Sequence, residues 1–470
     1  MSFSGLPCEL IIEILSCFDE RRDFLSLSKT CRLFNIISTP YLYSEVFYKQ
    51  TIEMPPYLFL RTIVDHPNLA KLTKFFRCEE LPVWPRDTYN DLPISNATWR
   101  SIRTKIEEAS SDEEHAKYWY QAISDLENYK TERCNAINAL IICLLPNLKK
   151  IDILRWEVLD VIIWGYRGHF LKRVFERAKG LQAKLGTSDK DPPPYCMSKL
   201  SSISIAADDG PGRSYESDVH LSVIIPYLEL PSVKNFFGHE ITRDFEGYRT
   251  PEAFTSQVED LCLEQCGMKD ETLRGFLGSC SSLRKFSYEW WAKGSGVMFY
   301  SDAMIKGLMA SINTLEVIEI DVAFNLDGKR CIIIGPEAIV PPFSFINFRK
   351  LREISVNAYM ILGPPDEQGA FLQRIPRSLE SLTLTDCRST CYTELQTVMA
   401  LVRQKEEFAP ELKYLKLVYE NTTHPVGPVP KEMVGSGLVE ECKKAGVQLI
   451  LKCVLRAQSV ESDDSFYLSI

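Results

Sequence analysis

The chain has 470 residues, of which 45% are hydrophobic and 25% are charged, a composition typical of a globular protein with two or three domains. Its formal net charge of -9 argues against general binding to nucleic acid or to an anionic membrane surface. The longest apolar run, at 139–145, is far shorter than the roughly 18 residues of a membrane span, and the first residues lack a signal-peptide pattern, so we expect a cytoplasmic or nuclear protein.

The first predicted elements are three short helices within residues 5–40. Apolar residues recur at helical spacing after Pro7, Asp23 is expected to cap the second helix, and Thr39 and Pro40 are expected to end the third. Three helices of this size bury too little surface to offset the entropy of the chain. We therefore expect their apolar stripe to be covered by a partner.

Residues 4–46 resemble an F-box in the order Leu6-Pro7, Glu9-Leu10, Ile14-Leu15, Asp23-Phe24-Leu25, Leu27, Thr30-Cys31-Arg32 and Phe34. The resemblance implies that residues 1–48 form an F-box that docks on the Skp adaptor, and through it on the cullin scaffold, of an SCF-type ubiquitin ligase. It implies adaptor-binding positions at Leu6, Pro7, Leu10, Ile14, Leu15, Leu25, Leu27 and Cys31. The alternative is a helical bundle that packs only on the rest of the chain.

Residues 49–147 are predicted to hold a linker, a weak first repeat at 69–76 and a helical insertion. The insertion extends from about Asn96 to Leu145, and the polar stretch at 107–114 is expected to divide it into two helices. A helical pair at this place would shield the edge strand of the following sheet, as the caps of repeat proteins do.

Residues 148–455 contain a recurrent hexad, L-x-x-L-x-L with conservative replacements. Copies begin at Leu148, Leu200, Val258, Leu283, Leu315, Leu351, Leu379 and Leu412, with a weaker copy at 233–238. Each hexad predicts a short strand, often followed by a helical segment such as 270–280 or 393–405. Stacked units of this kind share one core, so the predicted fold class is α/β: a three-helix F-box, then an irregular leucine-rich-repeat solenoid with a helical insertion.

An ordinary α/β domain is the alternative fold. The chain has neither the G-x-G-x-x-G nor the G-x-S-x-G motif that such enzymes often carry. Residues 456–470 are predicted to be a disordered acidic tail.

Residues between the inward apolar positions of the strands should form one face of the sheet. This face is predicted to be acidic, through Asp260, Glu264, Glu289, Glu319, Asp321 and Glu353, and we interpret it as a binding surface for a basic target. A merely solvated surface is the alternative. Trp290 and Trp291 are strand neighbours that face opposite ways, so one of them is expected to be exposed as a target contact, unless a loop covers it.

No catalytic, metal or cofactor signature is found. The six histidines are scattered, the fifteen cysteines are an odd number, and the pairs Cys262 with Cys266 and Cys387 with Cys391 have no histidine nearby. We therefore predict a non-catalytic substrate-recognition subunit of an SCF-type ligase, similar to fungal F-box and leucine-rich-repeat proteins, which binds an unknown protein target through its repeats. The alternative function is a scaffold that works independently of any ligase.

Overall fold

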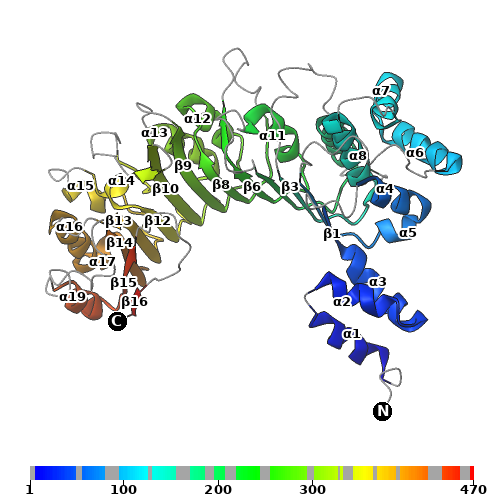
Figure 1. The fold of residues 1–470 in the computed structure, drawn as a ribbon. Helices are drawn as coiled ribbons and strands as arrows, with labels where there is room; N and C mark the ends of the chain where they lie inside the picture. Colours follow the sequence, from blue (N-terminus) through cyan, green and yellow to red (C-terminus); the bar gives the residue numbers. More distant parts are fainter. Residues whose placement is uncertain are drawn as a thin grey trace. The chain divides into compact units, whose positions relative to one another are not determined.

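The computed structural model describes residues 6–18, 20–48, 56–79, 95–124, 130–154, 170–185, 195–206, 219–243, 254–293, 301–326, 329–331, 342–363, 368–387, 392–421, 437–455 and 466–469. The chain divides into two compact units. Unit 1 comprises Met1–Ser217 with Glu229–Lys234, and unit 2 comprises Asp218–Leu228 with Asn235–Ile470. Each unit alternates strands and helices, with helices on one face of its sheet (Figure 1).

Unit 1 begins with the three predicted helices, α1 (Cys8–Ser16), α2 (Arg21–Ser28) and α3 (Arg32–Ser44). Two details of the prediction are wrong. Asp23 lies in the first turn of α2 and Glu20 occupies the cap position. Pro40 lies inside α3, which continues to Ser44, because Leu42 beyond the proline is held in the core of the three helices.

A parallel sheet follows directly in unit 1. Its strands are β1 (Glu45–Tyr48), β2 (Phe75–Glu79), β3 (Lys150–Leu154) and β4 (Ser202–Ala206), paired in that order. The hexad at 148–153 and its weak copy at 69–76 therefore both lead into strands. Between the strands lie helices α4 (Pro56–Asp65), α5 (Pro67–Ala70) and α10 (Phe170–Leu185), together with the insertion.

The helical insertion contains three described helices, α6 (Asn96–Ala109), α7 (Glu113–Ser124) and α8 (Lys130–Leu144), where the sequence predicted two. The Ser95 hydroxyl caps α6 by accepting a hydrogen bond from the Thr98 amide at 3.1 Å. These helices pack on one another and on α4 and α10. Among the described residues, the edge strand is β1, which follows α3 and pairs only with β2.

Unit 2 holds the longer series of strands. The main sheet has the order β6 (Asn235–His239), β8 (Asp260–Cys266), β9 (Lys285–Lys293), β10 (Val317–Leu326), β12 (Glu353–Asn357), β13 (Ser381–Cys387), β14 (Tyr414–Asn421), β15 (Gln448–Leu455) and β16 (Phe466–Ser469). Strand β11 (Lys329–Cys331) pairs with β10, and β5 (Val219–His220) pairs with β7 (Ile241–Arg243).

The helices of unit 2 connect its parallel strands. They are α11 (Leu221–Leu228), α12 (Asp270–Gly278), α13 (Ser301–Leu308), the 3-10 helix η4 (Met309–Ser311), α14 (Ala358–Leu362), α15 (Gln368–Leu372), α16 (Tyr392–Arg403), α17 (Lys405–Phe408) and α19 (Leu438–Ala445). The helices predicted at 270–280 and 393–405 are therefore present as α12 and α16.

The hexad sets the register of this sheet. Its fourth position is occupied in neighbouring strands by Phe236, Leu261, Phe286, Ile318, Ile354, Leu382, Leu415 and Leu449, all paired side by side and all buried. Such a ladder buries one face of every strand against the helices. The predicted fold class, N-terminal helices followed by parallel strands alternating with helices, is confirmed.

The C-terminal region departs from the prediction. Phe466–Ser469 forms β16 and pairs antiparallel with β15, so the predicted disorder is wrong for these four residues. The remainder of the predicted tail, 456–465, lies outside the described residues. No described helix is both long enough and apolar enough to cross a lipid bilayer.

Candidate functional site

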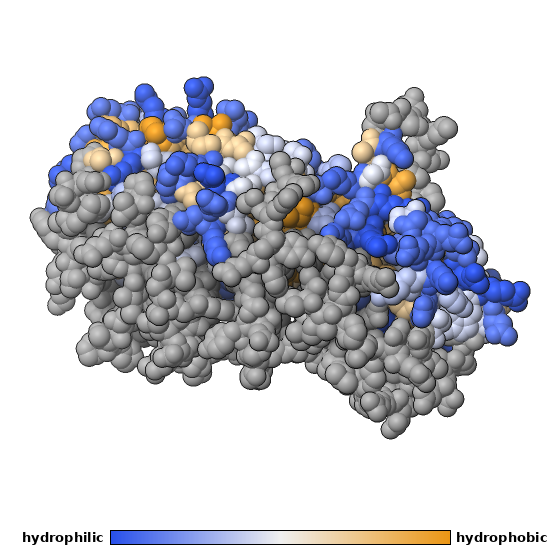
Figure 2. All heavy atoms as spheres, turned by 90° about the horizontal axis from the view of Figure 1, so that it is seen from above, coloured by the Kyte–Doolittle hydropathy of each residue, from blue (hydrophilic) through white to orange (hydrophobic). Residues whose placement is uncertain are grey.

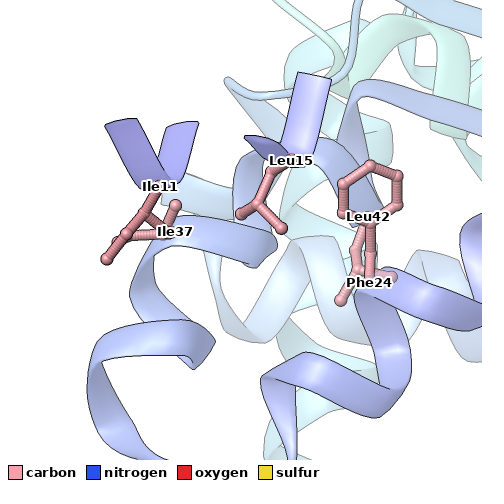
Figure 3. Close-up of a cluster of buried hydrophobic side chains, with 5 residues drawn as sticks. All are labelled: Ile11, Leu15, Phe24, Ile37 and Leu42. Carbon is pink, nitrogen blue, oxygen red and sulfur yellow. The ribbon is translucent and has the colours of Figure 1, made fainter. Parts of the chain in front are cut away.

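The three N-terminal helices enclose a small core of their own. Ile11 and Leu15 of α1, Phe24 of α2, and Ile37 and Leu42 of α3 point toward one another (Figure 3). The ring of Phe24 also stacks on Tyr41, with 4.9 Å between the ring centroids. The apolar stripe of α1 is therefore divided, since Ile11 and Leu15 face this core.

The same helices leave large apolar side chains exposed on their other sides. Leu10 is 46% exposed, Ile12 45%, Leu25 46% and Ile36 60%, and we call these four residues the apolar helix surface. Single exposed leucines are ordinary. Because Leu10 and Ile12 are two residues apart on α1, they lie on different sides of that helix, so the name covers the exposed apolar residues of the three helices and not one continuous patch.

The structure sorts the eight residues predicted from the F-box resemblance by their exposure. Pro7, Leu10, Leu25 and Cys31 are exposed, whereas Leu6, Ile14 and Leu27 are half-buried. Leu15 is fully buried in the core, so we correct its assignment from contact to packing. Ile12 and Ile36 were missed, although both are apolar residues outside the core stripe, which is a signal available in the sequence.

The second candidate surface is the face of the unit 2 sheet opposite its helices. The six predicted acidic residues, Asp260, Glu264, Glu289, Glu319, Asp321 and Glu353, lie on strands β8, β9, β10 and β12, and none has a fully buried side chain. We call them the acidic strand face. Glu289 and Asp321 are direct neighbours across β9 and β10, which places two carboxylates side by side.

Lys285 partly neutralises this face, and the prediction from the sequence gave that lysine little weight. Lys285 pairs in register with Asp260, and its Nζ lies 3.3 Å from Oε1 of Glu319. Burial raises the pKa of the Asp260 carboxyl, while the nearby Lys285 charge acts in the opposite direction. The amide of Asn357 donates to Asp321 at 3.2 Å, so the Asp321 carboxylate is held in place.

Of the two tryptophans, Trp290 is 2% exposed and belongs to the core. The prediction that it contacts a target is therefore wrong, because its strand position faces the helices. Trp291 pairs with Ala323 in the sheet, but its side chain lies outside the described residues.

The described histidine, cysteine and acidic side chains do not gather into a metal site, since no group of three of them could hold a metal ion. Burial raises the pKa of the Cys262 thiol to about 11 and that of Cys280 to about 12, so these thiols are poor nucleophiles.

A cavity of about 770 Å³ in unit 1 is lined mainly by charged and polar residues, and the Ser111 hydroxyl donates to the neighbouring Asp112 carboxylate at 2.7 Å. Hydrogen bonds from the His115 amide and the Ser111 hydroxyl lower the pKa of the Asp112 carboxyl, which makes it a weak base. It is lined by Ser111, Asp112, Lys172, Arg173, Glu176, Arg177, Gly180, Leu181 and Lys184.

The described surface seen in Figure 2 is mostly hydrophilic, with hydrophobic residues in small groups.

Comparison with known families gives two matches. A family model described as "Leucine-rich repeat domain" matches residues 45–425, and a model described as "F-box-like" matches residues 3–49. No curated protein matches the chain. The two matched regions meet at β1, where the three N-terminal helices pass into the sheet.

Proposed function

Because the chain belongs to the leucine-rich repeat domain family and has an F-box-like domain ahead of its repeats, we propose that it is the substrate-recognition subunit of an SCF-type ubiquitin ligase. This architecture is typical of SCF substrate receptors, which are non-catalytic adaptors, and an F-box implies binding to the Skp adaptor. The observation that carries the proposal is the apolar helix surface, which lies within the F-box match and is left uncovered by the chain's own residues.

The F-box docks on the adaptor through Leu10 and Leu25, with Ile12 and Ile36 as further apolar contacts. A partner that covers these side chains removes apolar surface from water, which is the main favourable contribution to such an interface. Pro7 and Cys31 are exposed at the N-cap positions of α1 and α3 and complete the contact. The core residues Ile11, Leu15 and Phe24 keep the three helices in the geometry that the adaptor meets.

The repeats hold the target protein on the acidic strand face. The six carboxylates of this face, of which Glu319 pairs with Lys285, outnumber that one lysine and favour a partner that carries lysine or arginine, mainly by steering the encounter. In this proposal the chain tethers the target protein to the ligase. A target held by the repeats has a raised effective concentration near the activated ubiquitin, and the bond-forming chemistry belongs to other subunits.

We place this function in the cytoplasm or the nucleus. The chain has fifteen cysteines, an odd number spread over its length, which favours reduced thiols and so a reducing compartment.

The experiment compares the full-length chain with a variant carrying Leu10→Asp and Leu25→Asp, each expressed with and without proteasome inhibition. The wild-type chain should co-purify with the Skp adaptor and cullin, and proteins bound to its repeats should accumulate when the proteasome is inhibited. The variant should lose the ligase subunits yet retain the repeat-bound proteins. A ligase-independent scaffold would instead retain the same partners at unchanged levels in all four samples, and that result would refute the proposal.

A further inference from the structure

A row of lysines borders the edge of the unit 1 sheet at which its parallel strands begin. Lys74 accepts a backbone hydrogen bond from Lys149 at 2.7 Å, Lys149 accepts one from Ser201 at 2.9 Å, and Ser201 accepts one from Lys234 at 2.9 Å. These four residues therefore occupy the same position in successive strands. Three of the four are lysines, and they lie on the segments that lead into the sheet.

Further lysines lie on the same edge. The Asn147 amide donates to the Lys71 carbonyl at 2.5 Å, and Lys199 donates to the Asn147 side-chain oxygen at 2.6 Å, so Lys71 and Lys199 flank this asparagine. Lys150 follows Lys149 directly. We call the set the lysine edge: Lys71, Lys74, Lys149, Lys150, Lys199 and Lys234.

Few acidic groups offset this charge locally. Asp152 pairs with Lys150 at 3.3 Å, and Glu45 begins the neighbouring strand β1. Lys71, Lys74 and Lys149 are exposed and form no ion pair with the described residues. The lysine edge is thus a concentrated positive surface on a chain whose formal net charge is -9.

The equivalent position in unit 2 is built differently. Its backbone hydrogen bonds connect Glu259, Arg284, Glu316, Arg352, Glu380 and Lys413 in successive strands, so the charges alternate in sign. The side chains neutralise one another, with Arg284 3.1 Å from Glu316 and Lys413 2.7 Å from Glu380. The same fold can therefore balance the charge at this position, whereas in unit 1 Lys71, Lys74 and Lys149 have no ion pair with the described residues.

We infer that the lysine edge is a docking surface for an acidic segment of a protein partner, distinct from the apolar helix surface and the acidic strand face. Neighbouring strands are about 4.8 Å apart, so Lys74 and Lys234 are separated by three spacings, about 14 Å. An extended acidic peptide of about four or five residues covers that distance.

The composition of the edge favours a polypeptide over a nucleic acid. Its cations are all lysines, which act as hydrated point charges, whereas phosphate recognition often uses the arginine fork. The one aromatic residue among the strand-start positions beside it, Phe75, is half-buried, with the Lys150 ammonium 4.9 Å from its ring centroid and Phe47 packed edge-on at 5.1 Å. Phe47 is itself 37% exposed, but a single ring is less than the series of aromatic side chains on which a nucleic acid strand stacks its successive bases.

The test measures binding of a fluorescein-labelled poly-glutamate peptide to the full-length chain by fluorescence anisotropy at low salt. The test variant carries Lys71→Glu, Lys74→Glu and Lys149→Glu. The matched control carries Lys350→Glu, Lys443→Glu and Lys444→Glu, which reverse three exposed lysines of unit 2. Labelled poly-glutamine and a labelled single-stranded oligonucleotide are the comparison probes.

The wild-type chain should bind poly-glutamate in preference to both comparison probes, and the affinity should fall as salt rises toward ~150 mM. The test variant should lose at least about tenfold in affinity, and the control less than about twofold. If the triple reversal lowers the melting temperature, the corresponding glutamine variant should still lose about threefold. Any of three results would overturn the inference: no binding of poly-glutamate by the wild-type chain, equal losses of affinity in both variants, or stronger binding of the oligonucleotide than of poly-glutamate.

Discussion

Truncating Leu10 and Leu25 to alanine is expected to weaken binding to the Skp adaptor without unfolding the chain. Each side chain is 46% exposed. Covering the exposed part of one leucine removes roughly 80 Å² of apolar surface from water, worth about 2 kcal/mol at about 25 cal/mol per Å². Each truncation should therefore raise the dissociation constant up to about 30-fold, and the double variant up to about 1000-fold.

Isothermal titration calorimetry of the purified chain with purified adaptor measures this loss. Ser26→Ala is the matched control, because Ser26 is an exposed neighbour of Leu25 in α2 whose hydroxyl donates only to the Arg22 carbonyl. Leu15→Ala provides the contrast in stability, since removing a fully buried leucine should cost about 2–5 kcal/mol of folding free energy and lower the melting temperature. Unchanged affinity in the double variant, with the melting temperature of the wild type, would refute the assignment of the apolar helix surface.

Three further predictions follow from the packing and electrostatics of the two units. Gly307→Ala should destabilise the contact of α13 with α12 by about 1–3 kcal/mol in urea unfolding, because its Cβ would lie 2.9 Å from the Arg274 carbonyl oxygen, whereas Gly275→Ala in open space should be neutral or stabilising. Burial and the Arg173 charge lower the pKa of His115 to about 4, so the unfolded chain takes up a proton first as the pH falls. The free energy of unfolding should therefore be highest above about pH 6.5 and decline toward pH 4 by at most about 3 kcal/mol. Thermal unfolding scans of His115→Phe should show a smaller decline with falling pH. A decline equal to that of the wild type would contradict the assignment of this pH dependence to His115. The charge reversals Glu289→Lys, Glu319→Lys and Asp321→Lys on the acidic strand face should together reduce the amount of target recovered in low-salt pull-downs. Unchanged recovery would exclude electrostatic steering by this face.

The repeat architecture was readable from the sequence because each strand obeys a local rule. Alternate residues of a strand face opposite sides, so a hexad with apolar fourth and sixth positions specifies which side is buried, whatever the rest of the chain does. Leu261 and Leu263, for example, are both fully buried, and the intervening Cys262 is half-buried. The hexad was less informative where copies are weak, and β15 was included in the predicted repeat region without being recognised as a repeat strand.

The details that failed depend on contacts between elements. The spacing of α1 marked Leu10 and Leu15 as one stripe, but only the packing of α2 and α3 shows that Leu15 is enclosed and Leu10 is not. Helix α3 continues past Pro40 because the packing of Leu42 outweighs the cost of the proline. Trp290 is buried, although its sequence neighbourhood equally allowed a surface position.

The sequence by itself thus determined the order of the units, the strands and their buried side, because these follow from the periodicity of apolar residues. Tertiary structure alone decided which apolar residues of the first helices remain exposed. It also decided that the lysines of unit 1 gather at one edge, whereas the equivalent position in unit 2 alternates in charge. Lys74, Lys149 and Lys234 are far apart in the chain, and they become neighbours only when parallel strands pair in register.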